Sequence, residues 1–214
     1  QNTFMGVNTG LKNTSGCYNT FLGFTAGATN TTGCCNTYVG RGAGGGYLTG
    51  NANVSLGMCS GPQGTNASGC HNFTGGYKSG NALTTGSHNV IIGRCAGAAK
   101  TSGCSSVFIG HCAGVNAGTA TSAIVIGACA GKCFSPSINQ HGSGYGNIFV
   151  GEYAGKCVTT GIVNVLIGKC AGCCLHGSHT TIAIGANAGA KTCAANDNAV
   201  SYTHLRAHET CPYL

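Results

Sequence analysis

Cysteine is the most chemically versatile residue type in this sequence and accounts for 16 of its 214 residues. Several cysteines recur at intervals of 17 residues, as in Cys17 and Cys34 and again in Cys95, Cys112 and Cys129. If successive 17-residue segments stack as β-strands do, about 4.8 Å apart, their Cα atoms fall within the distance window for a disulfide. We therefore predict a cysteine ladder over these five residues, in which Cys17–Cys34, or one pair from the other three, bridges neighbouring segments.

Such a density of cysteine suits an oxidising compartment, where disulfides form and persist. The alternative is that the thiols are free and act as small hydrophobic side chains stacked in a buried ladder. Both interpretations remain open from the sequence.

Groups for acid–base, nucleophilic or metal chemistry are scarce. Asp and Glu together number 3, so a carboxylate pair for acid–base catalysis is hard to assemble. His111 and Cys112 would point to opposite faces of an extended strand, which argues against a Cys–His nucleophile. The pair Cys170 and Cys173 is too close in sequence to the pair His176 and His179 for a zinc finger. We predict no catalytic residue, no metal site and no cofactor.

An internal repeat runs through nearly the whole chain and must position these side chains. A glycine, here called the anchor glycine, recurs every 17 residues, with a two-residue insertion after the fourth copy and a seven-residue insertion after the eighth. A second glycine follows each anchor glycine by four residues. The eleven anchor glycines are Gly6, Gly23, Gly40, Gly57, Gly76, Gly93, Gly110, Gly127, Gly151, Gly168 and Gly185.

Two hydrophobic columns precede the anchor glycine. One is the residue immediately before it, as in Leu22 and Ile109, and the other lies two residues earlier, as in Thr20 and Val107. The second column is β-branched or aromatic in every copy, which favours strands. Because alternate residues of a strand share a face, we assign both columns to the core and the variable residue between them to the outside.

Asparagine opens the expected strand in eight copies. Side-chain amides stacked about 4.8 Å apart can hydrogen-bond into a ladder. We predict an Asn ladder that begins with Asn2, Asn19, Asn36, Asn53, Asn72 and Asn89 and continues at Asn147 and Asn164.

One strand, one tight glycine corner and a second extended arm fit one coil of a parallel β-solenoid, or β-roll. A helical repeat does not fit, because no 3.6-residue periodicity is present and glycine is too frequent. A single coil cannot bury its apolar face, so stacking must supply the stability. We therefore predict an all-β chain of about eleven 17-residue coils, which at about 4.8 Å each form a rod on the order of 50 Å long.

The repeat strings resemble known surface proteins. Residues 19–23 (NTFLG) and 181–189 (TIAIGANAG) are similar to head repeats of trimeric autotransporter adhesins and to the NTFLG…AG repeats of phage and algal-virus tail fibres. The resemblance covers roughly residues 1–199. It implies left-handed parallel β-rolls, often assembled as trimers. Those families are usually poor in cysteine, and this chain departs from them in that respect.

The last fifteen residues differ from the repeat. The anchor glycine expected at position 202 is replaced by Tyr202, and the composition changes abruptly from Val200 onward. The run from Val200 to Thr210 resembles the conceptual translation of a sequencing adapter. We therefore divide the chain into a solenoid repeat domain, 1–199, and a non-native tail, 200–214; a genuine C-terminal cap is the alternative.

Charge and hydropathy narrow the range of partners. Only 6% of the residues are charged, and the net charge of +7 is not gathered into a run of Lys and Arg, so a nucleic-acid or membrane-surface partner is disfavoured. No apolar stretch approaches the roughly 20 residues needed to span a bilayer. We expect an extracellular, cell-surface or virion-surface protein, and the resemblance implies a homotrimer.

We predict a structural or adhesive shaft segment of a fibre, without catalysis, that reaches a host surface or glycan through a tip outside this segment. The alternatives are a disulfide-linked coat or matrix protein, and an ice- or carbohydrate-binding solenoid, which would need a regular outward ladder of Thr. The seven-residue insertion carries Pro136, His141 and Tyr145 and is the first candidate for a binding loop. A tolerated surface insertion is the alternative.

Overall fold

Short segments rich in β-branched and aromatic residues form one strand in each coil. The computed structural model describes residues 1–64, 66–135, 145–177 and 179–190 and the backbone of 200–202. The strands are β1 (Thr3–Met5), β2 (Thr20–Leu22), β3 (Thr37–Val39), β4 (Val54–Leu56), β5 (Phe73–Gly75), β6 (Val90–Ile92), β7 (Val107–Ile109), β8 (Ile124–Ile126), β9 (Ile148–Val150), β10 (Val165–Ile167), β11 (Ile182–Ile184) and β12 (Val200–Tyr202).

All twelve strands pair in sequence order into one parallel sheet. Equivalent residues of neighbouring coils face each other, as in Thr20↔Thr37. The insertions leave this register unchanged, since Val54 pairs with Phe73 and Ile124 with Ile148. The extra residues are therefore accommodated in the loops. This arrangement confirms the predicted all-β solenoid with 17-residue coils.

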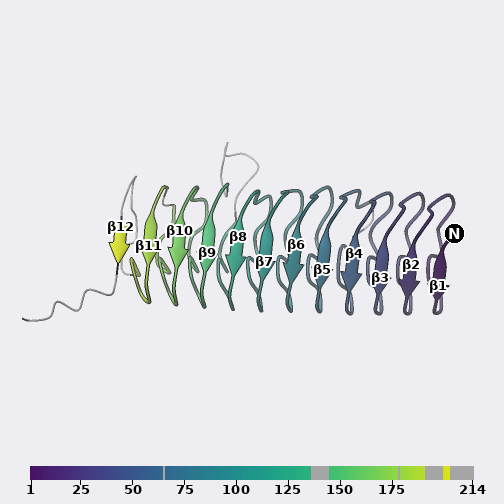
Figure 1. Cartoon of the computed structure of the whole chain (residues 1–214), viewed down its shortest axis with the longest axis horizontal. Helices are drawn as coiled ribbons and strands as arrows, with labels where there is room; N and C mark the ends of the chain where they lie inside the picture. The colour runs from purple at the N-terminus through teal and green to yellow at the C-terminus, as the bar shows by residue number, and fades with distance from the viewer. Residues whose placement is uncertain (65, 136–144, 178, 191–199, 203–214) are drawn as a thin grey trace, which may run out of the picture.

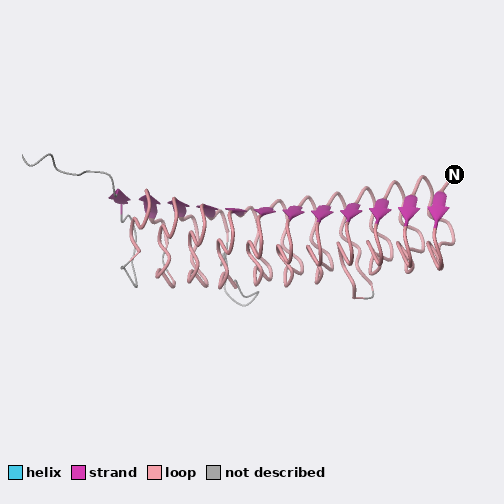
Figure 2. Cartoon of the chain, turned by 90° about the horizontal axis from the view of Figure 1, so that it is seen from below, coloured by secondary structure: helices cyan, strands magenta, loops and turns pink. Residues whose placement is uncertain are grey.

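The coils stack along a rod (Figure 1). The strands line one side of it, here called the sheet face, and the turns and loops form the other (Figure 2). The described part of the chain contains no helix that is long and apolar enough to cross a membrane.

The prediction of which strand residues face the core was wrong. The variable middle residue of each strand points inward: Phe21, Tyr38, Ile91 and Phe108 are fully buried. The two flanking columns point outward, and Leu22 remains 41% exposed. The alternation of inward and outward side chains along each strand was predicted correctly, but the inward and outward positions were exchanged.

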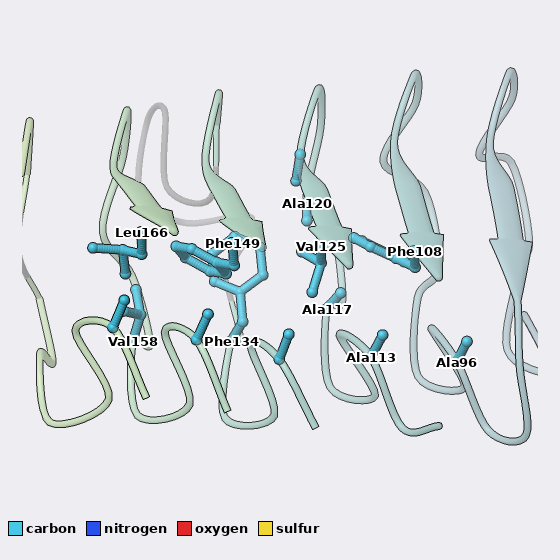
Figure 3. Packing of buried hydrophobic residues seen from close by; sticks show 14 of the residues in the cluster. Ala96, Phe108, Ala113, Ala117, Ala120, Val125, Phe134, Phe149, Val158 and Leu166 are labelled. Carbon is cyan, nitrogen blue, oxygen red and sulfur yellow. The ribbon is translucent and has the colours of Figure 1, made fainter. Parts of the chain in front are cut away.

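The interior is narrow. Side chains of the strands and of the opposite wall fill it. Middle strand residues such as Phe108, Phe149 and Leu166 point toward the opposite wall, which carries Ala113 three residues after an anchor glycine and Phe134 seven residues after one (Figure 3). Phe134 contacts Phe149 of the next coil edge-on, with ring centroids 5.4 Å apart. Because the opposite wall varies in size as well, the middle column can vary without leaving the core unfilled.

The first coils contain a stack of aromatic rings in the same interior. Phe4, Phe21 and Tyr38 lie nearly parallel, with centroids 4.8 and 4.7 Å apart, and Tyr47 continues the stack at 5.6 Å. The spacing of the first three rings follows the spacing of the strands, because the same position of three stacked coils holds an aromatic residue. Tyr47 joins the stack from the opposite wall, seven residues after the anchor Gly40.

Both repeat glycines are required by geometry. The anchor Gly110 has φ +131°, and a Cβ built there would lie 2.7 Å from the carbonyl oxygen of Gly127 in the next coil. The second glycine lies beneath the core side chain: a Cβ on Gly27, at φ +57°, would lie 2.5 Å from the ring of Phe21. Only glycine satisfies both the positive φ and the close approach.

Strand pairing continues beyond β11. β12 pairs with β11 in parallel, with Ile184 opposite Tyr202. The sheet thus extends three residues into the segment interpreted as a non-native tail, with the register shifted by one residue from the expected anchor position. Residues 203–214 lie outside the described residues.

We predict that Gly110→Ala lowers the free energy of unfolding by at least about 3 kcal/mol, because it adds strain at positive φ to a clash with the neighbouring coil. Urea denaturation followed by circular dichroism measures this. Gly64→Ala is the matched control, since a Cβ at Gly64 meets nothing within 4 Å. Equal effects of the two substitutions would contradict the assignment of the anchor glycines.

Candidate functional site

The Asn column forms a buried ladder of hydrogen bonds. The backbone N–H of Asn36 donates to Oδ1 of Asn19 at 2.9 Å, and the Asn19 side-chain amide donates to the carbonyl of Gly33 at 2.8 Å. Asn53 and Asn72 repeat the pattern, as do Asn89 and Asn164. Asn2, at the first coil, accepts from Asn19 and is exposed. The ladder satisfies buried polar groups and leaves no free amide for a ligand.

A lysine compensates for a break in this ladder. Ser106 and Ala123 occupy two consecutive positions where the repeat would place Asn. There the ammonium of Lys100, which is fully buried, donates to the carbonyl of Ala120, and Ser106 Oγ donates to the same oxygen at 3.3 Å. The Ala120 carbonyl corresponds to the one that a ladder Asn would satisfy. The sequence analysis missed Lys100, although the paired loss of Asn at positions 106 and 123 was a signal.

Burial lowers the pKa of Lys100 to about 7, and Cys104 opposes this shift only in part. The ammonium lies 5.3 Å from the ring centroid of Phe108, deep in the interior. Lys100 is therefore part of the core, where its ammonium satisfies the carbonyl of Ala120.

Cysteines at one corner serve as hydrogen-bond acceptors in a second ladder. The backbone N–H of Cys17 donates to Cys34 Sγ at 3.2 Å, and that of Cys34 donates to Asn51 Oδ1 at 2.7 Å. Further along, the N–H of Asn51 donates to Cys70 Sγ and that of Ser87 to Cys104 Sγ, both at 3.3 Å. Cysteine, asparagine and serine share this column because each offers an acceptor. Neither of the interpretations offered for the thiols anticipated this role.

Cys17 and Cys34 form a close cysteine pair. Their Sγ atoms lie 3.1 Å apart, and both are free thiols. The hydrogen bond between them raises the pKa of Cys17 and lowers that of Cys34. A thiol beside a more acidic thiol is the arrangement from which a disulfide forms under oxidation. Cys70 and Cys104 lack this option, because Asn51 and Ser87 separate them from the next cysteine in the column.

Cys95, Cys112 and Cys129 occupy the same turn position of three consecutive coils, with φ of 56°, 55° and 54°. Burial raises the pKa of Cys112, and the neighbouring Cys95 and Cys129 raise it further. Cys112 therefore has Cys95 on one side and Cys129 on the other, and all three thiols are free.

The expectation that His111 and Cys112 point to opposite faces was wrong. Cys112 has a left-handed backbone and not an extended one, so its Sγ lies 3.5 Å from His111 Nε2. Arg94 Nη1 lies 3.0 Å from the same nitrogen. The raised pKa of Cys112 nevertheless disfavours the thiolate that a nucleophile needs.

The predicted binding loop falls largely outside the described residues, since Pro136 and His141 belong to the span 136–144. Tyr145 is 54% exposed, and its carbonyl accepts from the Val163 backbone. Within the described ranges, no group of three or more His, Cys, Asp or Glu side chains is arranged to hold a metal ion.

Comparisons of this chain with protein-family models, curated proteins and solved structures gave no match.

We predict that Cys17 and Cys34 become a disulfide when the reduced protein is equilibrated with oxidised glutathione. Peptide mass spectrometry after alkylation measures this. Cys35 is the internal control, because it is exposed and its stacked neighbours are Tyr18 and Ala52, so it should remain alkylated. Full alkylation of Cys17 and Cys34 under conditions that oxidise glutathione-sensitive thiols would refute the pairing.

We predict that Lys100→Met stabilises the protein more at pH 7 than at pH 9.5. Between the folded pKa of about 7 and the ordinary 10.5, the unfolded chain binds a proton that the folded chain does not. Raising the pH through this range therefore stabilises the wild type by up to about 1.4 kcal/mol per pH unit, and the variant lacks this gain. Urea denaturation under reducing conditions at both pH values tests this. A pH-independent difference between the two proteins would contradict it.

Proposed function

We propose that this chain is a shaft segment of a structural or adhesive surface fibre, and that it assembles as a homotrimer through the sheet face. The observation that carries the proposal is the chemistry of that face. Its two outward columns consist of apolar residues and threonine over the length of the rod, without a charged side chain from β1 to β11.

The sheet face is unusual for a surface in water. Leu56, Ile92 and Ile167 each remain 37% exposed in the same column, in different parts of the rod. Scattered exposed apolar side chains are normal, but a continuous stripe marks an interaction surface. A long stripe of this kind, on a sheet with uniform register, needs a partner of matching length.

Further copies of the same chain are the partner that fits best. The face repeats with the period of the coil, so a parallel copy presents the same residue types at the same spacing. Three copies around an axis along the rod would bury all three faces with closed symmetry and keep every chain pointing in one direction, as a shaft requires. The resemblance to trimeric adhesin heads points to the same assembly.

Two alternative functions are supported to different degrees by the sheet face and the cysteines. An ice-binding surface would need a regular outward Thr ladder; Thr3, Thr20 and Thr37 do form one in the first coils, contrary to their expected inward orientation, but the column continues as Val54 and Phe73. A disulfide-linked coat or matrix protein remains the second candidate, favoured by the exposed free thiols of Cys35 and Cys133, which are accessible to another chain. An extracellular or virion-surface location is part of the proposal.

We predict that residues 1–199 are trimeric by native mass spectrometry at micromolar concentration, and that Ile92→Lys/Ile109→Lys yields monomers. Both substitutions place charge in the middle of the proposed interface without touching the interior. Thr32→Lys/Thr85→Lys adds the same charge at exposed turns and should leave the trimer intact. Circular dichroism confirms that each variant is folded. A wild-type monomer would refute the trimer, and dissociation by the control pair would show that the sheet face is not the interface.

A further inference from the structure

The exposed basic residues gather on one edge of the rod. In the described ranges, every Lys or Arg except the buried Lys100 falls within the six positions that follow an anchor glycine. This surface, here called the basic edge, consists of Lys12, Arg41, Lys78, Arg94, Lys132, Lys156 and Lys169.

The fold brings these residues together although they are far apart in sequence. Arg94 and Lys132 belong to coils on either side of Cys112, and both act to lower the pKa of that thiol, against the larger effect of burial. His111 lies between them in contact with Arg94. The chain also turns back on itself here, since the Lys156 backbone N–H donates to the carbonyl of Tyr153, three residues earlier, at 3.1 Å.

Little negative charge opposes the basic edge. Glu152 is the one carboxylate side chain among the described residues, and it pairs with Lys169 at 3.1 Å. Both partners are largely exposed, so the pair is weak and can be exchanged for another anion. From Arg94 to Lys169, five consecutive coils each carry a basic residue or His111 on this edge, about 4.8 Å apart per coil.

We infer that the basic edge binds a linear acidic polysaccharide that runs along the rod. A row of basic side chains along the rod, one in each coil from Arg94 to Lys169, complements a linear polyanion. Single-stranded nucleic acid would also need free aromatic rings for base stacking. Two rings on this edge already lie beside cations: Lys78 is 5.3 Å from the Tyr77 ring centroid, and Lys156 is 5.2 Å from that of Tyr153. The exposed ring of Phe24 is on this edge as well, but it belongs to the second coil and lies outside the row from Arg94 to Lys169. This arrangement favours sulfate or carboxylate groups on a sugar chain.

The basic edge is separate from the proposed interface. Its residues lie in the turns that follow the strands, whereas the interface consists of the strands themselves, so a trimer would leave the edge accessible. The inference depends on the proposed fibre role in one respect only: the fibre role places the rod where it would encounter a polysaccharide. It extends that role by placing glycan contact on the shaft and not only at a tip.

Fluorescence anisotropy of labelled heparin with the full chain tests the inference, with dextran as the neutral probe and a thymidine 20-mer as the nucleic-acid probe. We expect saturable heparin binding that weakens as salt increases, because counterions are released on binding. Arg94→Gln/Lys132→Gln/Lys156→Gln should weaken heparin binding at least tenfold and reduce the salt dependence.

The matched control adds Ser15→Lys, Thr32→Lys and Thr85→Lys to that triple variant. These exposed positions lie on the opposite turn, so the control restores the net charge but not the basic edge. Continued weak binding supports the inference, and restored binding would overturn it in favour of net charge alone. Tighter binding of the thymidine 20-mer than of heparin, or equal binding of dextran, would overturn the partner class. Native mass spectrometry of the same samples reports the trimer independently.

Discussion

The in-register stacking of one coil on the next is the constraint on which the rest of this structure depends. Backbone hydrogen bonds, the Asn ladder and the stacked glycines all require that position i lie directly over its equivalent in the neighbouring coil. Gly110 illustrates the strictness of this constraint, since even a methyl group there would meet the backbone of the next coil. Insertions are accepted only in the loops, as between β4 and β5 and between β8 and β9.

The architecture could be predicted from the sequence because the repeat is nearly invariant at the positions where the backbone tolerates few residue types. Anchor glycines, second glycines and Asn recur at fixed positions, and each has one conformational or hydrogen-bonding role that few residues can fill. The inward face was misassigned for the opposite reason. Ser55 and Phe149 occupy the same core column because the facing wall can compensate for their size, so the true core column looks variable. The uniform outward columns resembled a core; their proposed burial against other copies would require the same uniformity.

Side-chain contacts in the turns were harder to foresee. The left-handed backbone at Cys112 brought it to His111, and no strand pattern could indicate this. Likewise, Lys100 belongs to a column that elsewhere holds Tyr47, Leu83 or Phe134, and its role depends on Ser106 in the neighbouring ladder. The basic edge was invisible as a run of charge, because its successive members are 13 to 38 residues apart in sequence and come to one edge only through stacking. The sequence therefore predicted the stacking of the coils. It did not predict side-chain contacts between residues at two different positions of the repeat.

The Asn ladder also gives the rod a direction. The Asn19 side chain makes both of its hydrogen bonds with residues 14 and 17 positions later in the chain, at Gly33 and Asn36. The side-chain amide and carbonyl of a ladder Asn therefore find their partners only when the following coil has been synthesised. During translation, the chain would close as a zipper from its first coil onward, each new turn completing the one made before it. Every intermediate would expose only a single unfinished coil, whatever the final number of turns.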